Sequence, residues 1–221
     1  MADAPSPVLR SGYERGSAEF SRVIAFSDGV FAIAMTLLVV GIAVPVLHDQ
    51  DSVHELAEAL NDLVPNFVSF FISFAVIGRY WVAHHQFVAL LGRIDARFVG
   101  LNLLYLAFIA FLPFPTALLG TYFENPLSVA LYAVMVAIVS GMEVVLFRRA
   151  QRHGLLRETM PEDVYRFGVT GSLSPVVFFV LSVPVAFAST TLAVILWFGA
   201  IPFNAVLARW KPDQADRFFA Q

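Results

Sequence analysis

The chain has 221 residues, of which 58% are hydrophobic and 14% are charged, and its mean hydropathy is +0.74. This composition excludes an ordinary water-soluble domain, in which about a quarter of the residues are charged. The formal net charge is −3, and cysteine is absent, which excludes disulfides, thiolate metal sites and cysteine nucleophiles.

The apolar residues gather in six segments of twenty or so residues, the length that crosses about 30 Å of hydrocarbon. We therefore expect an all-α polytopic membrane protein with six transmembrane helices. The predicted spans are residues 22–47, 63–88, 98–120, 126–147, 167–188 and 190–208. Residues 1–16 are expected to form a polar N-terminal tail without the apolar core of a signal peptide. Residues 17–209 then form one transmembrane domain, and residues 210–221 a cytoplasmic C-terminal tail.

The 14 Lys and Arg residues favour one side of the predicted membrane. They precede the first span, surround the turn between the second and third, fill the loop after the fourth and follow the sixth. The opposite loops, 48–62 and 121–125, contain none. The positive-inside rule therefore predicts that both termini are cytoplasmic, in a bacterial plasma membrane. Loop 48–62 carries five acids, which fits either a solvated amphipathic helix or a vestibule that concentrates cations.

The first span begins with Arg22, Phe26, Ser27 and Asp28, an unusual concentration of polar groups in an apolar helix. A carboxylate at membrane depth is costly unless other groups satisfy it, so such a residue marks function by default. At about 100° per residue, one stripe of this helix collects an arginine and a series of apolar residues. The stripe consists of Arg22, Phe26, Gly29, Ile33, Leu37 and Val40, with Thr36 at its edge. Ser27 and Asp28 fall on opposite flanks, so they are expected to face neighbouring helices.

Partners for Asp28 are expected where the second and third spans approach the same side of the membrane. The candidates are Trp81, His84, His85, Asn102 and Arg79. A bonded network is predicted because unpaired polar groups are expensive in lipid. It can serve as a polar pin between helices or, with a histidine, as a proton relay, and both remain open. Metal binding is not expected, since adjacent histidines diverge by about 100° on a helix.

Two further features lie in the later spans. Glu143 precedes Arg148 and Arg149 by about a turn and a half of helix and is expected to pair with them. Prolines are expected to bend the third, fifth and sixth spans. They are Pro113, Pro115, Pro175, Pro184 and Pro202.

The sequence resembles prokaryotic members of the transmembrane protein 175 family of potassium channels. The residues that carry the resemblance are Arg22-x-x-x-Phe26-Ser27-Asp28, Phe31-Ala-Ile33-Ala-Met-Thr36-Leu37-Leu38, Trp81-Val-Ala-His84-His85, Leu101-Asn102-Leu103 and Pro113-Phe-Pro-Thr116. The resemblance implies a homotetramer with a central pore lined by the first span. It places the pore constriction at Ile33, Leu37 and Val40, with Thr36 as a polar ring. It also implies that the Arg22, Phe26, Ser27 and Asp28 motif holds the first span against its neighbours.

The leading hypothesis is a potassium-preferring channel for monovalent cations, with an apolar constriction in place of a carbonyl filter. We expect no enzyme, cofactor, metal or nucleic-acid partner, because the sequence lacks catalytic and phosphate-binding motifs. A proton-coupled transporter that uses Asp28 and a histidine of the second span is the alternative. A scaffolding protein with a sealed apolar axis is a third possibility.

Overall fold

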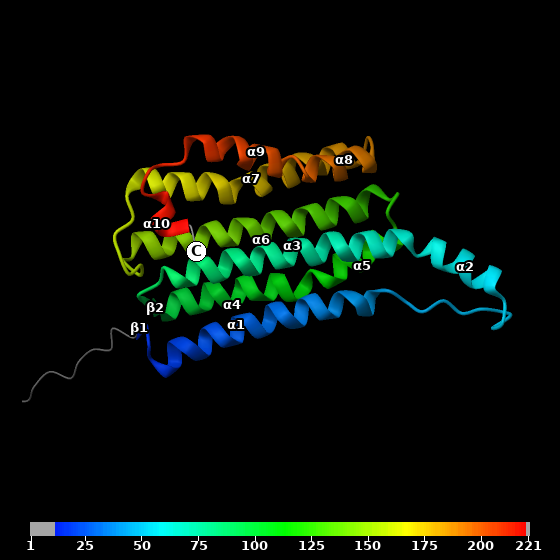
Figure 1. Ribbon diagram of the computed structural model, residues 1–221, viewed down its shortest axis with the longest axis horizontal. Coiled ribbons are helices and arrows are strands. Elements are labelled where there is room, and N and C mark those ends of the chain that lie inside the picture. Colours follow the sequence, from blue (N-terminus) through cyan, green and yellow to red (C-terminus); the bar gives the residue numbers. More distant parts are fainter. Residues whose placement is uncertain (1–11, 220–221) are drawn as a thin grey trace, which may run out of the picture.

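The computed structural model describes residues 12–219, which form an elongated bundle of helices aligned with its long axis (Figure 1). Within this range, six helical segments are long and apolar enough to cross a membrane, which confirms the predicted fold class. The first three segments are α1 (Ala18–Leu37) with the 3-10 turn η1 (Leu38–Gly41), α3 (Val64–Ala89), and α4 (Ala96–Phe111) with α5 (Pro113–Thr121). The other three are α6 (Pro126–Arg152), α7 (Glu162–Ala186), and α8 (Thr190–Trp197) with α9 (Ala200–Leu207) and η2 (Ala208–Trp210).

Three of the spanning helices, α1, α4 and α6, begin after residues whose side chains satisfy free backbone N–H groups. Ser17 accepts from the N–H of Phe20 at the start of α1, and Asp95 accepts from that of Phe98 at the start of α4. Asn125 accepts from the N–H of Leu127, next to a proline at the first position of α6. Such caps fix where each helix begins, and they are the residue types that favour helix starts.

Helix α6 lies at the centre of the bundle. It packs against α7 on one side and against α4 and α5 on the other, while α1 lies at an outer edge of the protomer against α3 and α4 (Figure 1). Hydroxyl groups join α3 to α6: Tyr80 Oη contacts Ser140 Oγ at 2.6 Å, and Ser73 Oγ donates to Tyr132 Oη at 3.0 Å. Interhelical bonds of this kind hold helices together where no hydrophobic difference exists between lipid and protein.

The first span is shorter than predicted. The prediction extends it to residue 47, but the helix ends at Gly41, and residues 42–52 run outside the bundle before α2 (Val53–Asp62). Apolar composition continues to Leu47 in the sequence, and this is why composition alone extended the span.

The predicted proline bends are confirmed in part. The third span breaks between Phe111 and Pro113, as expected. Pro175 and Pro184 lie inside helix α7, which continues past both of them, and the break in the sixth span precedes Pro202, at Phe198 and Gly199.

Both ends of the described chain are tied to the bundle. Strand β1 (Gly12–Glu14) pairs antiparallel with β2 (Arg93–Asp95), so part of the expected polar tail forms a small sheet; residues 1–11 lie outside the described residues. Gly16, with a φ of 89°, turns the chain from β1 into α1. The expected C-terminal tail includes a further helix, α10 (Ala215–Phe219), whose Ala215 and Phe218 are buried. Neither segment is long or apolar enough for sequence patterns to reveal it.

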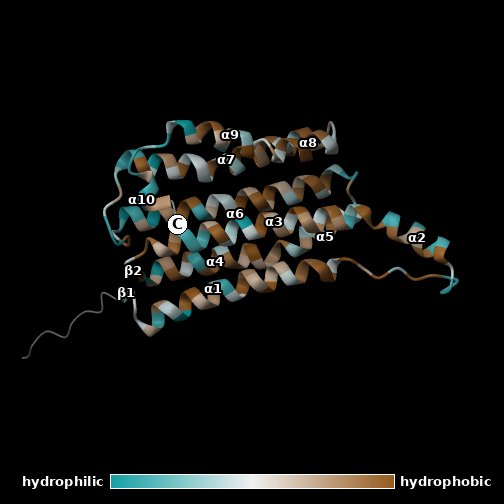
Figure 2. Cartoon of the chain, viewed as in Figure 1, coloured by the Kyte–Doolittle hydropathy of each residue, from teal (hydrophilic) through white to brown (hydrophobic). Residues whose placement is uncertain are grey.

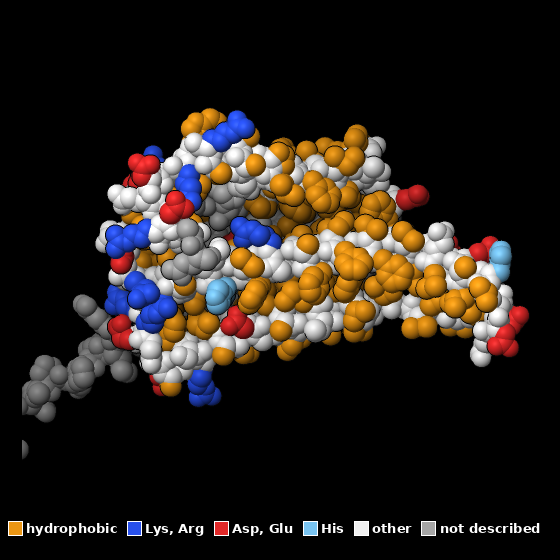
Figure 3. Space-filling view, in the orientation of Figure 1, with side chains coloured by type: hydrophobic (Ala, Val, Ile, Leu, Met, Phe, Trp, Pro, Cys, Tyr) orange, Lys and Arg blue, Asp and Glu red, His pale blue; other side chains and the backbone are white. Residues whose placement is uncertain are grey.

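The surface separates into three zones. Hydrophobic residues predominate along the middle of the bundle (Figure 2), and hydrophobic side chains cover that part of the face shown in Figure 3. Lys and Arg side chains gather at the end that carries β1, β2 and α10, whereas acidic and histidine side chains mark the α2 end in this view (Figure 3). The apolar zone is the part that a bilayer can cover, and the two ends differ in charge.

Candidate functional site

The stripe predicted on the first span is exposed on the outer edge of the protomer. Phe26, Ile33, Leu37 and Val40 are 55%, 59%, 45% and 74% exposed. Arg22, Gly29 and Thr36 on the same face are exposed as well. The opposite face of α1 is buried, through Phe20, Ser27, Phe31 and Ala34, followed by Leu38. The helix therefore has one face committed to its own protomer and an apolar face that its own chain leaves uncovered.

The 3-10 turn changes how the end of this face is built. Residues three apart in a 3-10 helix eclipse one another, with a rise of about 2 Å per residue. The 3-10 turn η1 begins directly after Leu37. Its tighter winding places the side chain of Val40 on the same side of the helix axis as that of Leu37, whereas an α-helix would rotate Val40 to one side. The three aliphatic side chains Ile33, Leu37 and Val40 are thus spaced by about 6 Å along one line.

Gly41 fixes the end of η1 against α5. A Cβ atom at this position would lie 3.0 Å from the Cβ of Ala117, which is inside ordinary van der Waals contact. The close approach therefore favours glycine, since an alanine here would need Ala117 to move by a few tenths of an ångström. Sequence reasoning missed this residue, because a glycine at the end of an apolar run also fits a simple helix terminus.

Thr36 lies beside the apolar line with its hydroxyl turned back to its own helix. Thr36 Oγ1 donates to the carbonyl oxygen of Ile33 at 2.9 Å. This bond uses the hydroxyl hydrogen and leaves the oxygen lone pairs available. An exposed ring of such oxygens would present acceptors, not donors, and acceptors are what a cation requires.

Behind the exposed face, a buried chain of hydrogen bonds joins α1, α3 and α4. The ring N–H of His84 donates to Asn102 Oδ1 at 3.0 Å, and Asn102 Nδ2 donates to Ser27 Oγ at 2.9 Å. Ser27 Oγ in turn donates to the carbonyl oxygen of Val23 at 3.0 Å. All three side chains are at most 2% exposed. Because the amide oxygen can only accept, the proton of neutral His84 resides on Nε2.

Aromatic rings enclose this chain of bonds. The ring of His84 stacks on that of Tyr105, with centroids 5.8 Å apart and planes within 9°, and Phe31 lies 5.5 Å from His84. Phe31 and Tyr105 are fully buried. Sequence reasoning did not single out Phe31 as a packing residue, although the spacing of Ser27, Phe31, Ala34 and Leu38 repeats every three or four positions and marks the buried face.

A proton relay needs a histidine bonded to Asp28, but the hydrogen-bond partner of Asp28 in the structure is Trp81. Its carboxylate accepts from Trp81 Nε1 at 3.0 Å, and the ring of His85 lies 5.7 Å from that of Trp81. The predicted polar residues thus divide into two groups: a buried one around Asn102, and a more exposed one around Asp28. Arg22 and Phe26 lie exposed on the protomer and belong to neither group.

The expected pairing of Glu143 with the following arginines is wrong for Arg149. That guanidinium binds Asp95, with Arg149 Nη2 donating to Asp95 Oδ2 at 2.5 Å. Asp95 also caps α4, so one carboxylate joins the α6 end to the start of α4. Glu143 instead lines a cavity of about 310 Å³, together with Arg79 of α3 and Asn204 of α9. Which of these charged side chains meet depends on their height along the packed helices, and not on their separation in the sequence.

Comparison with known proteins supports the same architecture. The family model described as endosomal/lysosomal potassium channel TMEM175 matches residues 22–113. A crystal structure of a lysosomal potassium-selective channel TMEM175 homologue from Chamaesiphon minutus is 34% identical, with a TM-score of 0.68, and covers 86% of this chain and 99% of that one. The chain belongs to the TMEM175 family.

Curated TMEM175 relatives match over part of their length. A potassium channel of Chamaesiphon minutus is 41% identical over 136 residues, which are 62% of this chain and 66% of that protein, just under two thirds. An endosomal/lysosomal proton channel TMEM175 of Gallus gallus is 39% identical over 109 residues, or 47% of this chain and 22% of that protein. The family and these relatives are channels and not enzymes.

Proposed function

We propose that the protein is a potassium-preferring cation channel whose pore forms where the exposed faces of α1 from four copies meet. The observation that carries the proposal is the apolar line of Ile33, Leu37 and Val40, uncovered on the outer edge of the protomer. Membership of a family of channels supports the same assignment. The family model and the Chamaesiphon minutus structure are described as potassium channels, which supports the choice of ion.

A pore of this kind is closed by water exclusion. Four copies would surround a shared axis with three successive layers of aliphatic side chains. Each layer consists of the same residue from all four copies: Ile33, Leu37 or Val40. Narrow apolar constrictions empty of water and block ions until they widen slightly. Thr36, with its oxygen lone pairs beside the apolar line, then supplies acceptors for a partly dehydrated cation. This arrangement differs from a carbonyl filter, because its oxygens come from side chains.

The proposed orientation places β1, β2 and α10 in the cytoplasm and α2 outside the bacterial cell membrane. The gathering of Lys and Arg at the β1 and α10 end supports it, since positive residues favour the cytoplasmic side (Figure 3). Both described termini then face the cytoplasm. The lipid bilayer covers the remaining apolar surface of each protomer.

Native mass spectrometry and flux in proteoliposomes test the proposal together. We expect a particle of four chains that carries potassium down its gradient without a proton gradient. Flux that requires a proton gradient would assign the protein to coupled transport. A four-chain particle without any cation flux would assign it to a scaffold. A lasting monomer in membranes would remove the shared axis and contradict the channel proposal.

The transporter alternative depends on a proton shared by Asp28 and a histidine. In the described structure Asp28 accepts from Trp81, and His84 donates to Asn102, so each group is engaged elsewhere. We therefore expect Asp28→Asn to retain potassium flux without acquiring or losing a dependence on the proton gradient. Asp28→Ala is expected to lower the yield of tetramer more than it changes ion preference, because it leaves the Trp81 N–H without its acceptor.

A further inference from the structure

Residues 42–62, here called the projecting arm, extend beyond the rest of the molecule. The arm consists of an extended segment, 42–52, and helix α2. Figure 1 shows both parts lying past the ends of α6 and α8, along the direction in which the spanning helices run. The span that ends at Gly41 already has 24 residues, enough to cross about 30 Å of hydrocarbon, so we expect the arm to lie outside the bilayer. Helix α2 contacts α3, the helix that follows it.

Apolar side chains of the projecting arm are nevertheless exposed. Val44, Val46 and Val53 are 88%, 94% and 83% exposed, and Leu56 and Leu60 on α2 are each more than 40% exposed. On a spanning helix such exposure is ordinary, because lipid covers it. Beyond the membrane, an accumulation of exposed aliphatic residues marks a surface that binds another protein.

The negative charge of the projecting arm argues against a membrane surface as its binding partner. The segment 48–62 contains five carboxylates and no Lys or Arg. Amphipathic helices that lie on membranes carry basic residues on their polar face, because most membranes are anionic. An acidic arm that points away from the bundle has neither the charge nor the direction for this role.

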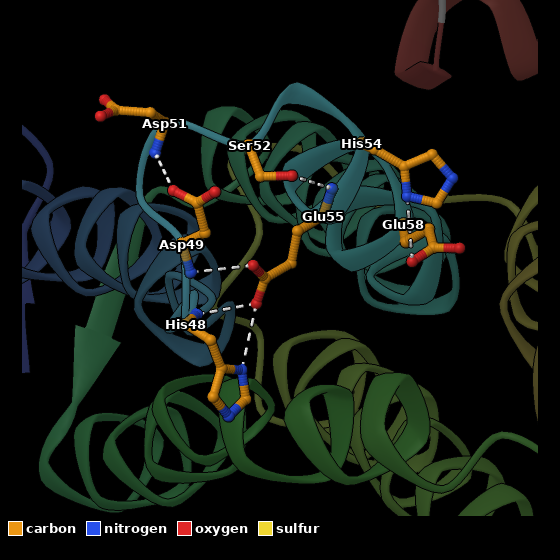
Figure 4. Close-up of polar contacts among 7 residues, drawn as sticks. All are labelled: His48, Asp49, Asp51, Ser52, His54, Glu55 and Glu58. Atoms are coloured by element: carbon orange, nitrogen blue, oxygen red, sulfur yellow. Dashed lines mark hydrogen bonds and ion pairs between the residues drawn. The ribbon is translucent and has the colours of Figure 1, made fainter.

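The projecting arm is held in a defined shape by its own hydrogen bonds. The carboxylate of Glu55 accepts from the backbone N–H groups of His48 and Asp49, at 2.7 and 3.0 Å, and from the ring of His48 at 3.1 Å (Figure 4). Ser52 caps α2 by accepting from the N–H of Glu55. These contacts fold the extended segment against the first turn of α2. A preformed surface loses less entropy on association than a loose loop does.

The exposed apolar surface of the arm is continuous along the chain with that of α1. Exposed residues follow one another from Leu37 and Val40 in the proposed pore face to Val44 and Val46 in the arm. A partner that meets α1 would therefore reach the arm as well. In a cyclic assembly each copy meets the next through the same two surfaces, so the contact repeats around the ring.

We propose that the projecting arm packs against a second copy of this chain, so that four arms form an extramembrane collar around the outer mouth of the pore. The inference rests on the proposed tetramer and adds an interface outside the membrane to it. Val44, Val46 and Val53 are covered in this collar, and the acidic side of α2 stays in water.

The absence of native cysteine makes the test direct, since single cysteines can be labelled without background. Val53→Cys is compared with His54→Cys, the adjacent residue whose side chain is 83% exposed and pairs with Glu58 on the polar side of α2. Each purified protein is treated with a water-soluble maleimide, as tetramer and as protomer obtained by dilution in the same detergent. We expect Val53→Cys to react about tenfold more slowly than His54→Cys in the tetramer, a ratio equivalent to about 1.4 kcal/mol. In the protomer both are expected to react at similar rates.

Each other outcome overturns the collar. Equal labelling of the two cysteines in an intact tetramer removes the collar and leaves the pore proposal standing. If Val53→Cys is protected from the maleimide in both tetramer and protomer, detergent or the same chain covers this residue, and not a second copy. Failure to find a tetramer at all removes both proposals.

A second measurement does not depend on dilution. The double variant Val46→Ser with Val53→Ser is expected to lower the temperature at which the tetramer dissociates, while His54→Ser leaves it unchanged. Equal dissociation temperatures in the two variants would contradict the collar.

Discussion

Asn102 is oriented by His84, whose Nε2–H donates to the amide oxygen and so directs the amide N–H group toward Ser27. The relationship joins α4, α3 and α1 through three side chains that are almost fully buried. These bonds fix the height and rotation of α1 relative to α3 and α4. The outer face of α1 takes no part in them and stays free to contact a partner.

Asn102→Ala is expected to destabilise the protomer by about 2 kcal/mol, because it leaves the buried N–H of His84 without its acceptor and removes the donor to Ser27, which keeps only its bond to Val23. Thermal unfolding followed by tryptophan fluorescence measures the effect. Asn61→Ala, on the exposed end of α2, is the matched control and is expected to be neutral. Equal melting temperatures for the two variants would show that the bonds around Asn102 add nothing to stability.

Ile33→Asn and Leu37→Asn are each expected to raise potassium flux and weaken the preference over sodium, because a polar ring wets the proposed constriction. Single-channel recording measures both effects. Val180→Asn, on an exposed position of α7, is the control and is expected to keep the parent conductance. Parent-like currents in both test variants would place the apolar line of α1 outside the pore.

Gly41→Ala is expected to reduce flux. The new Cβ would lie 3.0 Å from Ala117 Cβ and push η1 away from α5, toward the proposed axis. Gly100→Ala, where nothing lies within 4 Å of the added atom, is the control. It is expected to conserve flux and to stabilise α4 by up to about 1 kcal/mol, since alanine favours helix more than glycine. Unchanged flux in Gly41→Ala would mean that η1 does not set the throat.

Acid is expected to loosen the projecting arm. Backbone N–H groups of His48 and Asp49 lower the pKa of Glu55 below its ordinary value of 4.5, against a smaller opposing effect of desolvation. Because the native pKa is the lower one, the ionised carboxylate stabilises the arm above pH 4.5, and this contribution is lost as the pH falls through the native pKa. Hydrogen exchange of the two amides, relative to intrinsic rates, measures it. Glu55→Gln is expected to abolish the pH dependence; if it persists, another group is responsible.

Sequence alone predicts the six spans and the exposed line on α1, because both follow from residue spacing and helix geometry. It overextends the first span, since Val44 and Val46 are as apolar in the arm as they would be in lipid. It also assigns Glu143 to arginines of which Arg149 binds Asp95 instead, and it leaves the partner of Asp28 open among five candidates, of which the structure shows Trp81. Those depend on the rotation and height at which helices meet, and a single sequence does not specify either quantity.

The short elements were missed for a different reason. Strand β1 has three residues and is stabilised by pairing with β2, so its own residues carry no recognisable alternation. Helix α10 is held mainly by the burial of Ala215 and Phe218, with exposed ion pairs between Arg217 and Glu158, at 2.6 Å, and between Lys211 and Asp216. Tertiary partners, and not local preference, determine both elements.

The central position of α6 limits how this protein can be recombined with its relatives. The segment matched by the family model, residues 22–113, stops before α6 begins. Yet Ser73 and Tyr80 within that segment reach their hydroxyl partners, Tyr132 and Ser140, on α6. A chimera that exchanges the matched segment alone keeps these pairs only where the donor carries the same hydroxyl residues, so a donor that differs there has to bring its fourth helix as well.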